Sequence, residues 1–197
     1  MESSWAGRRH GLWSTPVLVG TIDATVELDA LASLILGRVD FGSPVGLSNV
    51  GAVRTRENLL QVESEAVEWL HRLILTTIRK LASTVSTASA PTSLLAEAWG
   101  NVYQDGDYQQ PHLHHNSAWS GVLYVRAPTS AAPAVGGDLE LYDPRPASAP
   151  YNCEEHVFRV RPAPGMIVAF PSWLMHAVTP YRGATPRVSI AFNATAA

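Results

Sequence analysis

Apolar residues recur every three or four positions in two segments of the first half of the chain. The spacing predicts a helix from about Val26 to Leu36 that ends at Gly37, and a longer helix from about Arg56 to Ala82. The apolar stripe of the longer segment consists of Val67, Leu70, Ile74, Ile78 and Leu81. Because the charged residues of this segment fall largely on its other faces, we expect the helix to pack one side on a sheet.

From Leu94 onwards the pattern changes to short β-rich runs separated by segments that contain Pro and Gly. Strands are predicted at Leu95–Tyr103, His112–His115, Ala118–Arg126, Asp138–Tyr142, His156–Arg161, Met166–Phe170, Leu174–Thr179 and Arg187–Asn193. Many short strands with frequent turns are typical of an antiparallel sandwich or barrel. Helices followed by strands predict an α+β fold, in which the helices brace one face of a β-sandwich.

The composition favours a soluble globular domain. The 197 residues suffice for a hydrophobic core, and 46% apolar with 16% charged residues is typical of globular rather than disordered chains. We expect residues 1–11 to form a flexible N-terminal tail and residues 12–197 to form a single domain. Cys153 is the only cysteine, which excludes an internal disulfide and favours a reducing compartment.

Two classes of partner find no support in the sequence. The net charge is −3 and Lys and Arg form no run, so no nucleic-acid footprint is visible. No apolar stretch approaches the roughly 20 residues that span a bilayer, and Pro16 and Gly20 interrupt the segment where a signal-peptide core would lie. The sequence therefore predicts a cytoplasmic protein with neither nucleic acid nor membrane as partner.

Histidines gather at one predicted strand. His112 and His114, at i and i+2, point to the same side of an extended strand, whereas His115 points to the other and is assigned to the surroundings of the site or to the core. His176 follows at the start of another extended run. Imidazole suits iron, zinc, copper and nickel, so the set predicts a metal site. The alternative is two polar residues at a strand end and an ordinary, partly buried His176.

Alternation is clear in the last predicted strand. We expect Val188, Ile190 and Phe192 to face the core, and Arg187, Ser189, Ala191 and Asn193 to face the other way. A guanidinium inside a barrel requires an anionic partner, so Arg187 and Ser189 predict a bound carboxylate. Asn101 and Tyr103, again at i and i+2, can donate hydrogen bonds to the same ligand. The alternatives are a solvent-facing edge strand and, for Asn101 and Tyr103, a strand end.

These residues resemble the Fe(II)/2-oxoglutarate-dependent oxygenase superfamily, and more narrowly its group of small 2OG-Fe(II) oxygenases. The similarity covers nearly the whole chain, at Leu12–Val17, Trp99–Tyr103, Pro111–Asn116, Ser120–Val125, Asp143–Arg145, Pro164–Met166, Phe170–His176 and Arg187–Asn193. The resemblance implies a double-stranded β-helix, a distorted and cupin-like jelly roll, here braced by the N-terminal helices. It also implies Fe(II) as the metal, with 2-oxoglutarate and O2 as co-substrates.

The resemblance also implies roles for residues of the predicted anion site. Arg187 would form a salt bridge with the 5-carboxylate of 2-oxoglutarate, and Ser189 would donate a hydrogen bond to it. Asn101 and Tyr103 resemble an Asn-x-Tyr pair that contacts 2-oxoglutarate in the nucleic-acid-demethylating branch of the superfamily.

One position departs from the family pattern. The family implies that His112 and His176 bind iron, with an Asp or Glu where this chain has His114. His114 either binds iron in a three-histidine site, or leaves a coordination position open, or is replaced by a carboxylate such as Asp138 or Glu140. We favour His114 as an iron ligand. The i, i+2 spacing directs its imidazole to the same side as that of His112, and a site with an open coordination position usually has a small residue there.

The sequence thus predicts a non-haem Fe(II)- and 2-oxoglutarate-dependent dioxygenase that hydroxylates an unactivated C–H bond and releases succinate and CO2. The substrate is a small molecule, an amino acid or a peptide, and a homodimer is left open. Trp119, Arg145 and Trp173 are candidate substrate contacts, although tryptophans are more often core residues and Arg145 could pair with a nearby acid. Two alternatives are a three-histidine iron dioxygenase that does not use 2-oxoglutarate and a non-catalytic jelly-roll binding module.

Overall fold

The structure is a computed structural model, and it describes residues 13–39, 48–55, 58–85, 93–127, 136–145 and 156–196. The predicted tail at residues 1–11 and Cys153 lie outside these ranges. The extent of the domain, residues 12–197, stays a prediction. No helix within the described residues is long and apolar enough to cross a membrane.

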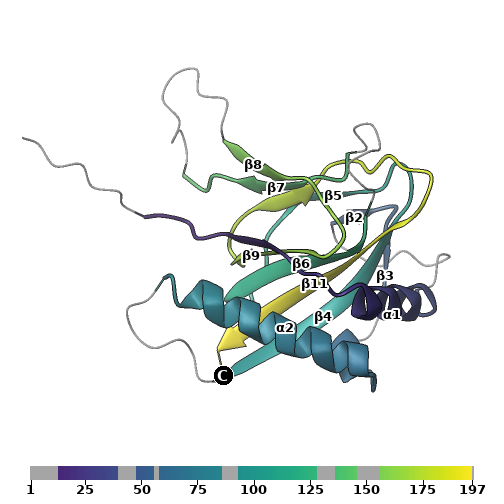
Figure 1. Cartoon of the computed structure of the whole chain (residues 1–197). Helices are drawn as coiled ribbons and strands as arrows, with labels where there is room; N and C mark the ends of the chain where they lie inside the picture. Colours follow the sequence, from purple (N-terminus) through teal and green to yellow (C-terminus); the bar gives the residue numbers. More distant parts are fainter. Residues whose placement is uncertain are drawn as a thin grey trace, which may run out of the picture.

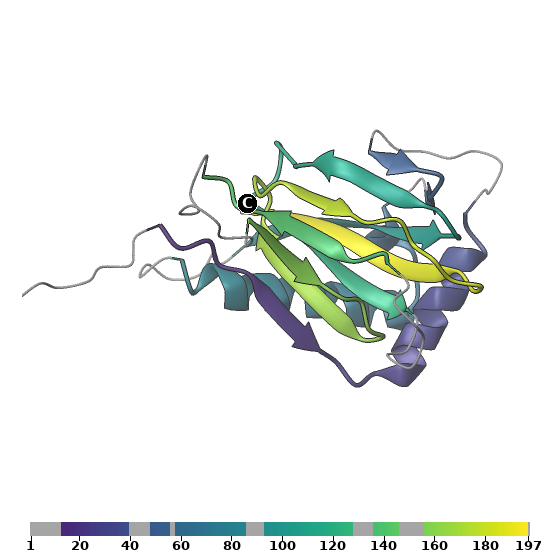
Figure 2. The ribbon, with the colours of Figure 1, turned by 90° about the horizontal axis from the view of Figure 1, so that it is seen from above.

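Two antiparallel sheets form the body of the molecule, and two helices cover one of them (Figures 1 and 2). The six-stranded major sheet has the order β1 (Leu18–Thr21), β9 (Met166–Pro171), β6 (Trp119–Arg126), β11 (Arg187–Ala196), β4 (Leu94–Tyr103) and β3 (Val53–Arg54). The five-stranded minor sheet has the order β2 (Asn49–Val50), β5 (Tyr108–His112), β10 (His176–Val178), β7 (Leu139–Tyr142) and β8 (Val157–Val160). The α+β class is confirmed.

Helices α1 (Thr25–Leu36) and α2 (Glu65–Ala82) pack against the outer face of the major sheet (Figure 1). Their buried Leu and Ile side chains form one cluster with the apolar face of β11, and each such side chain stabilises the fold by about 1.5–3 kcal/mol. Gly100 of β4 permits this contact, since a Cβ there would lie 2.6 Å from Ile35 Cγ1.

The predicted helix from Arg56 to Ala82 is wrong in its first part. Residues 59–61 form the short 3₁₀ helix η1 (Leu59–Gln61), and α2 begins only at Glu65. The Asn58 side chain accounts for the difference, because its Oδ1 accepts hydrogen bonds from the backbone N–H groups of Leu60 and Ala98. Such side-chain bonds compete with helix formation and here tie the segment to β4 instead.

Seven of the eight predicted strand segments contain a strand, whereas the one at His112–His115 contains only the last residue of β5. β5 ends at His112, and the His114 N–H leaves the ladder to donate to the Ser172 backbone carbonyl over 3.0 Å. A turn follows and exposes His115, so its assignment to the core is wrong, while its assignment to the surroundings of the site stays a prediction. The short strands β1, β2 and β3 were not predicted.

β11 lies in the middle of the major sheet, between β4 and β6. The alternative of a solvent-facing edge strand is therefore wrong. Val188, Ile190 and Phe192 face the helices, as the alternation predicted. The opposite face of β11 lines a cavity between the two sheets.

Candidate active site

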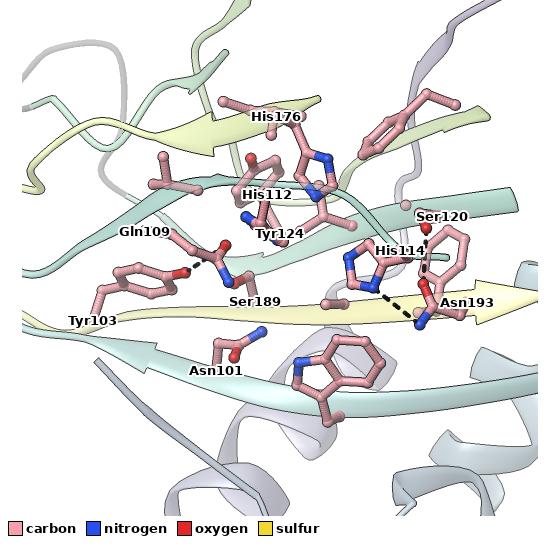
Figure 3. Close-up of a pocket in the computed structure, with 18 of the residues that line it drawn as sticks. Asn101, Tyr103, Gln109, His112, His114, Ser120, Tyr124, His176, Ser189 and Asn193 are labelled. Atoms are coloured by element: carbon pink, nitrogen blue, oxygen red, sulfur yellow. Dashed lines mark hydrogen bonds between the residues drawn. The ribbon is translucent and has the colours of Figure 1, made fainter. Parts of the chain in front are cut away.

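The cavity between the sheets has a volume of about 50 Å³. Figure 3 shows Tyr103 and Gln109 at one end and His114, Ser120 and Asn193 at the other. Histidines from the minor sheet and from the loop after β5 stand over polar residues from the major sheet. Both predicted clusters, the histidines and the face of Arg187, therefore line one cavity.

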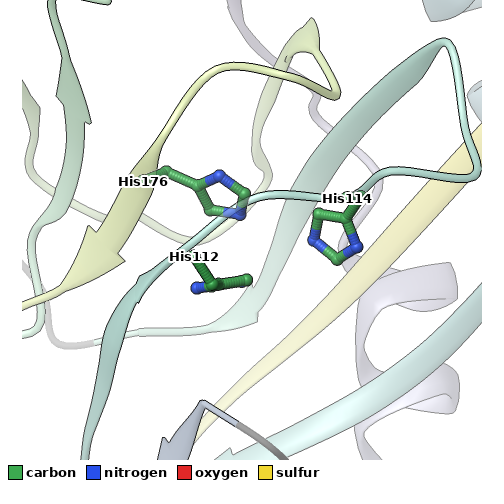
Figure 4. A group of neighbouring side chains, drawn as sticks. All are labelled: His112, His114 and His176. Carbon is green, nitrogen blue, oxygen red and sulfur yellow. The ribbon is translucent and has the colours of Figure 1, made fainter.

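Strand register brings two of the histidines together. His112 of β5 lies directly opposite His176 of β10, and their ring centroids are 4.1 Å apart. His114 follows the end of β5, with its ring centroid 5.3 Å from each of the other two. One ligand nitrogen from each residue lies within 4.8 Å of the others (Figure 4). This spacing makes the three residues candidate ligands of one metal ion.

Backbone carbonyls fix the tautomer of His112 and His176. His112 Nδ1 lies 2.8 Å from the Gln110 oxygen, and His176 Nδ1 lies 2.8 Å from the Leu174 oxygen. A carbonyl only accepts, so each Nδ1 carries the hydrogen of the neutral ring. Each Nε2 then has a free lone pair, the usual arrangement of a metal-binding histidine.

Burial keeps the three imidazoles neutral. Burial, together with a smaller effect of nearby His112, lowers the pKa of His176 to about 3 and that of His114 to about 4. Burial also lowers the pKa of His112, against the opposing effect of the Gln110 carbonyl. Near pH 7 all three rings are therefore in the uncharged form that a metal requires.

Arg187 lines the same cavity as the histidines and is enclosed there, with only 1% of its surface exposed. Its Cζ lies 4.0 Å from the Tyr103 ring centroid, 5.7 Å from that of Tyr124 and 5.6 Å from that of Tyr181. Nη1 donates to the Gly137 carbonyl, whereas Nε has no hydrogen-bond partner among the described residues. A buried guanidinium with rings and one carbonyl around it requires an anionic ligand.

The remaining predicted cofactor-binding residues lie around Arg187. Ser189, Asn101 and Tyr103 are buried and line the cavity, and Asn101 Oδ1 has no partner within the described part of the chain. Burial raises the pKa of Tyr103 and of Tyr124 despite the opposing charge of Arg187. Both phenols thus keep their hydrogens and can donate them to an anion.

Of the two carboxylates that could have replaced His114, Glu140 is hydrogen-bonded elsewhere, whereas Asp138 Oδ1 has no hydrogen-bond partner among the described residues. Glu140 accepts hydrogen bonds from Tyr142 and from Arg159, each over 2.7 Å. Asp138 Oδ1 lies 3.8 Å from Arg161 Nε. Neither belongs to the group of metal-ligating side chains found among the described residues, so the structure does not support a carboxylate that reaches in from β7.

The three candidate substrate contacts lie outside this cavity. Trp119 packs against the core beneath the helices, and Trp173 is half exposed. Arg145 is exposed and forms an ion pair with Asp143 over 2.8 Å. The structure therefore gives none of the three a contact with the candidate metal or anion position.

Several residues of the cavity were missed from the sequence. Tyr124 lies opposite Ser189 in the register of β6 and β11, and Gln109 accepts a hydrogen bond from the Tyr103 hydroxyl over 3.5 Å. Alternation along β6 was the available signal, since Ser120, Val122 and Tyr124 share one face. Alternation along β4 likewise places Glu97 on the face of Asn101, but its contact with Asn193 depends on strand register.

Comparison with known proteins identifies the arrangement. Residues 97–193 match the family model described as "Putative 2OG-Fe(II) oxygenase". In a comparison with curated proteins, no sequence matches. The chain is similar to the crystal structure of a prolyl-4-hydroxylase from Pseudomonas putida, with 16% identity, a TM-score of 0.66, and coverage of 91% of this chain and 92% of that one.

Two further solved structures are similar. A prolyl hydroxylase from Trichoplax adhaerens, in complex with a peptide fragment of the hypoxia inducible factor oxygen degradation domain, has 15% identity and a TM-score of 0.67, with coverage of 93% of this chain and 84% of that one. HygX from Streptomyces hygroscopicus, with nickel and 2-oxoglutarate bound, has 16% identity and a TM-score of 0.61, with coverage of 92% of this chain and 83% of that one.

The similar structures confirm the predicted double-stranded β-helix. The segment matched by the family model contains every residue that lines the cavity. Residues 97–193 thus form a domain of the 2OG-Fe(II) oxygenase family, which uses Fe(II), 2-oxoglutarate and O2.

Proposed function

We propose that this protein hydroxylates an unactivated C–H bond of a small molecule, an amino acid or a peptide, with Fe(II) held by His112, His114 and His176. The observation that carries the proposal is the buried guanidinium of Arg187, which shares a cavity with the three histidines and has no carboxylate partner among the described residues. A metal face and an anion clamp in one enclosed space fit a chelating dicarboxylate co-substrate.

The donor set fits Fe(II). His112 and His176 present Nε2 lone pairs whose tautomers are fixed by backbone carbonyls, and all three rings are neutral near pH 7. Fe(II) with 2-oxoglutarate would supply the O2-dependent oxidation of the C–H bond, coupled to loss of CO2 and formation of succinate. Three neutral ligands leave the full charge of the ion in place, which favours a dianionic co-substrate.

The surroundings of Arg187 fit the distal carboxylate of 2-oxoglutarate. The unpaired Nε of Arg187 and the hydroxyl of Ser189 can both donate to one carboxylate. Tyr103 and Tyr124 keep their phenolic hydrogens, and they also exclude water from the guanidinium. Exclusion of water strengthens the ion pair and protects the oxidant from side reactions.

Similar proteins support both small-molecule and peptide substrates. The Trichoplax adhaerens hydroxylase is in complex with a peptide fragment, and HygX is also found with hygromycin B bound. A three-histidine dioxygenase that binds its substrate directly to iron is disfavoured, because such an enzyme needs no clamp for a second carboxylate.

Anaerobic titration with Fe(II) and 2-oxoglutarate tests the proposal. We expect a visible charge-transfer band that requires both additions, and succinate once O2 and substrate are admitted. Arg187→Ala should lower the affinity for 2-oxoglutarate about 100-fold, because the carboxylate loses a buried, charged hydrogen-bond partner. Arg145→Ala, which removes an exposed arginine, should leave the titration unchanged. No band in the wild-type protein would contradict the proposal.

A further inference from the structure

A row of three polar side chains crosses the major sheet beside His114. The register places Asn193 of β11 opposite Glu97 of β4 on one side and opposite Ser120 of β6 on the other. Ser120 Oγ donates to Asn193 Oδ1 over 2.8 Å, and Asn193 Nδ2 donates to Glu97 Oε1 over 3.0 Å. The same Nδ2 lies 3.4 Å from His114 Nδ1 (Figure 3).

Glu97 fixes the orientation of the Asn193 amide. An ionised carboxylate only accepts hydrogen bonds, so the amide nitrogen and not the amide oxygen must face it. The hydroxyl of Ser120 can donate or accept, and it therefore does not oppose this orientation. The amide nitrogen has two hydrogens, of which one is donated to Glu97 and the other is directed to His114.

This orientation determines the tautomer of His114. Its Nδ1 faces a group that can only donate, so Nδ1 must accept and the neutral ring carries its hydrogen on Nε2. Figure 4 shows the ring of His114 turned with its second nitrogen toward His112 and His176. His114 thus directs an N–H group into the cavity, whereas His112 and His176 direct lone pairs into it.

We propose that Glu97 and Asn193 are positioning residues that decide whether His114 binds the metal, an inference that rests on the proposed function. A bond from Nε2 to a metal requires the hydrogen on Nδ1, and this hydrogen needs an acceptor. Asn193 supplies one only if its amide turns so that Oδ1 faces His114. The turn breaks the hydrogen bond to Glu97 and places two oxygens against each other. Glu97 therefore opposes metal binding by His114.

The tautomer can be measured in the metal-free protein. Long-range ¹H–¹⁵N spectra near neutral pH should show the Nε2–H form of His114 and the Nδ1–H form of His112 and His176. Glu97→Gln should move His114 toward the Nδ1–H form, because a glutamine amide can donate to Asn193 Oδ1. Glu97 is exposed, so the exchange is compatible with folding. Glu97→Gln/Asn193→Asp should complete the change, since the aspartate only accepts.

The control for lost charge is Glu68→Gln on the exposed face of α2, which should leave the spectrum of His114 unchanged. The inference is overturned if His114 of the wild-type protein has the Nδ1–H form, or if neither variant at Glu97 alters its tautomer. A purely structural role of Glu97 would not move this signature.

Co(II) titration gives the functional readout. Glu97→Gln should raise Co(II) affinity about tenfold, as expected for a residue that orients a metal ligand. The same exchange should have no effect in a His114→Ala background, since the coupled ligand is gone. A gain of equal size in that background, or no gain at all, would overturn the inference. If wild-type protein binds no Co(II), the proposed metal site fails, while the tautomer measurement still decides the inference.

Discussion

His112 and His176 lie beside His114 in the cavity, but the three imidazoles are held in different ways. The first two project from paired strands and donate Nδ1–H to backbone carbonyls over 2.8 Å. His114 projects from a loop, and its Nδ1 faces the side-chain amide of Asn193 at 3.4 Å. A backbone carbonyl can only accept, whereas an amide side chain can turn.

The three histidines form the candidate metal face. His112 and His176 are its fixed part, and His114 is its adjustable part. His112 and His176 need no change of tautomer to bind a metal, because each already donates Nδ1–H to a backbone carbonyl. His114 stands where the resemblance to the family implied a carboxylate, and its availability as a ligand depends on Asn193 and Glu97. Substitutions at the two parts should therefore have unequal effects.

Loss of a fixed ligand should have the largest effect. We expect His176→Ala to lower Co(II) affinity by at least about 100-fold, because it removes a buried donor whose lone pair already faces the site. Isothermal titration would measure the change, with His71→Ala on the exposed face of α2 as the control. A change of less than about tenfold would place the metal elsewhere.

Loss of the adjustable ligand, His114, should lower metal affinity by a smaller factor. His114→Ala should lower Co(II) affinity about tenfold, since part of the binding free energy of this ligand is spent on turning the Asn193 amide. The same titration would measure it. A loss as large as that of His176→Ala would contradict the distinction between the two parts of the metal face.

Acidification should destabilise the metal-free protein through the buried histidines. The pKa of His176 is lowered to about 3 in the folded protein, whereas the unfolded chain titrates near 6.5. The unfolded chain therefore binds more protons between these values, and the stabilising effect of the neutral ring is complete above about pH 6.5 and declines as the pH falls.

Urea unfolding at pH 7 and pH 5 would measure this decline. The free energy of unfolding should fall by on the order of 1 kcal/mol more in the wild-type protein than in His176→Gln, which has no titrating ring. Equal pH dependence in the two proteins would show that His176 is not held in the neutral form.

Removal of a nearby carboxylate should have the smallest effect on metal binding. Glu140→Gln should change Co(II) affinity less than about twofold, because Glu140 is paired with Tyr142 and Arg159 rather than with the histidines. A large loss of affinity would revive the interpretation in which a carboxylate of β7 completes the metal site.

Strand alternation made much of the site predictable from the sequence. Because side chains alternate with a period of two, the polar face of Arg187 and Ser189 could be separated from the apolar face of Val188 and Ile190 without a structure. Both faces lie as expected, one on the cavity and one on the helices. The i, i+2 spacing predicted His112 and His114 on one side, and both line the cavity, but β5 ends at His112 and alternation is not the reason.

Register between distant strands and the exact ends of elements could not be predicted. Nothing local in the sequence shows that Glu97 lies opposite Asn193, because this pairing is set by contacts across the whole sheet. β5 ends at His112 because His114 bonds to the Ser172 carbonyl, a partner far away in the chain. These unpredictable contacts distinguish His114 from the other two histidines.

The most direct test of the account is an anaerobic crystal structure with Fe(II) and 2-oxoglutarate. We predict one metal ion about 2.1 Å from Nε2 of both His112 and His176, with the distal carboxylate of 2-oxoglutarate on the guanidinium of Arg187. In the same crystals, a bond from His114 to the metal should coincide with a turned Asn193 amide. A metal bound away from His112 and His176, or a carboxylate away from Arg187, would contradict it.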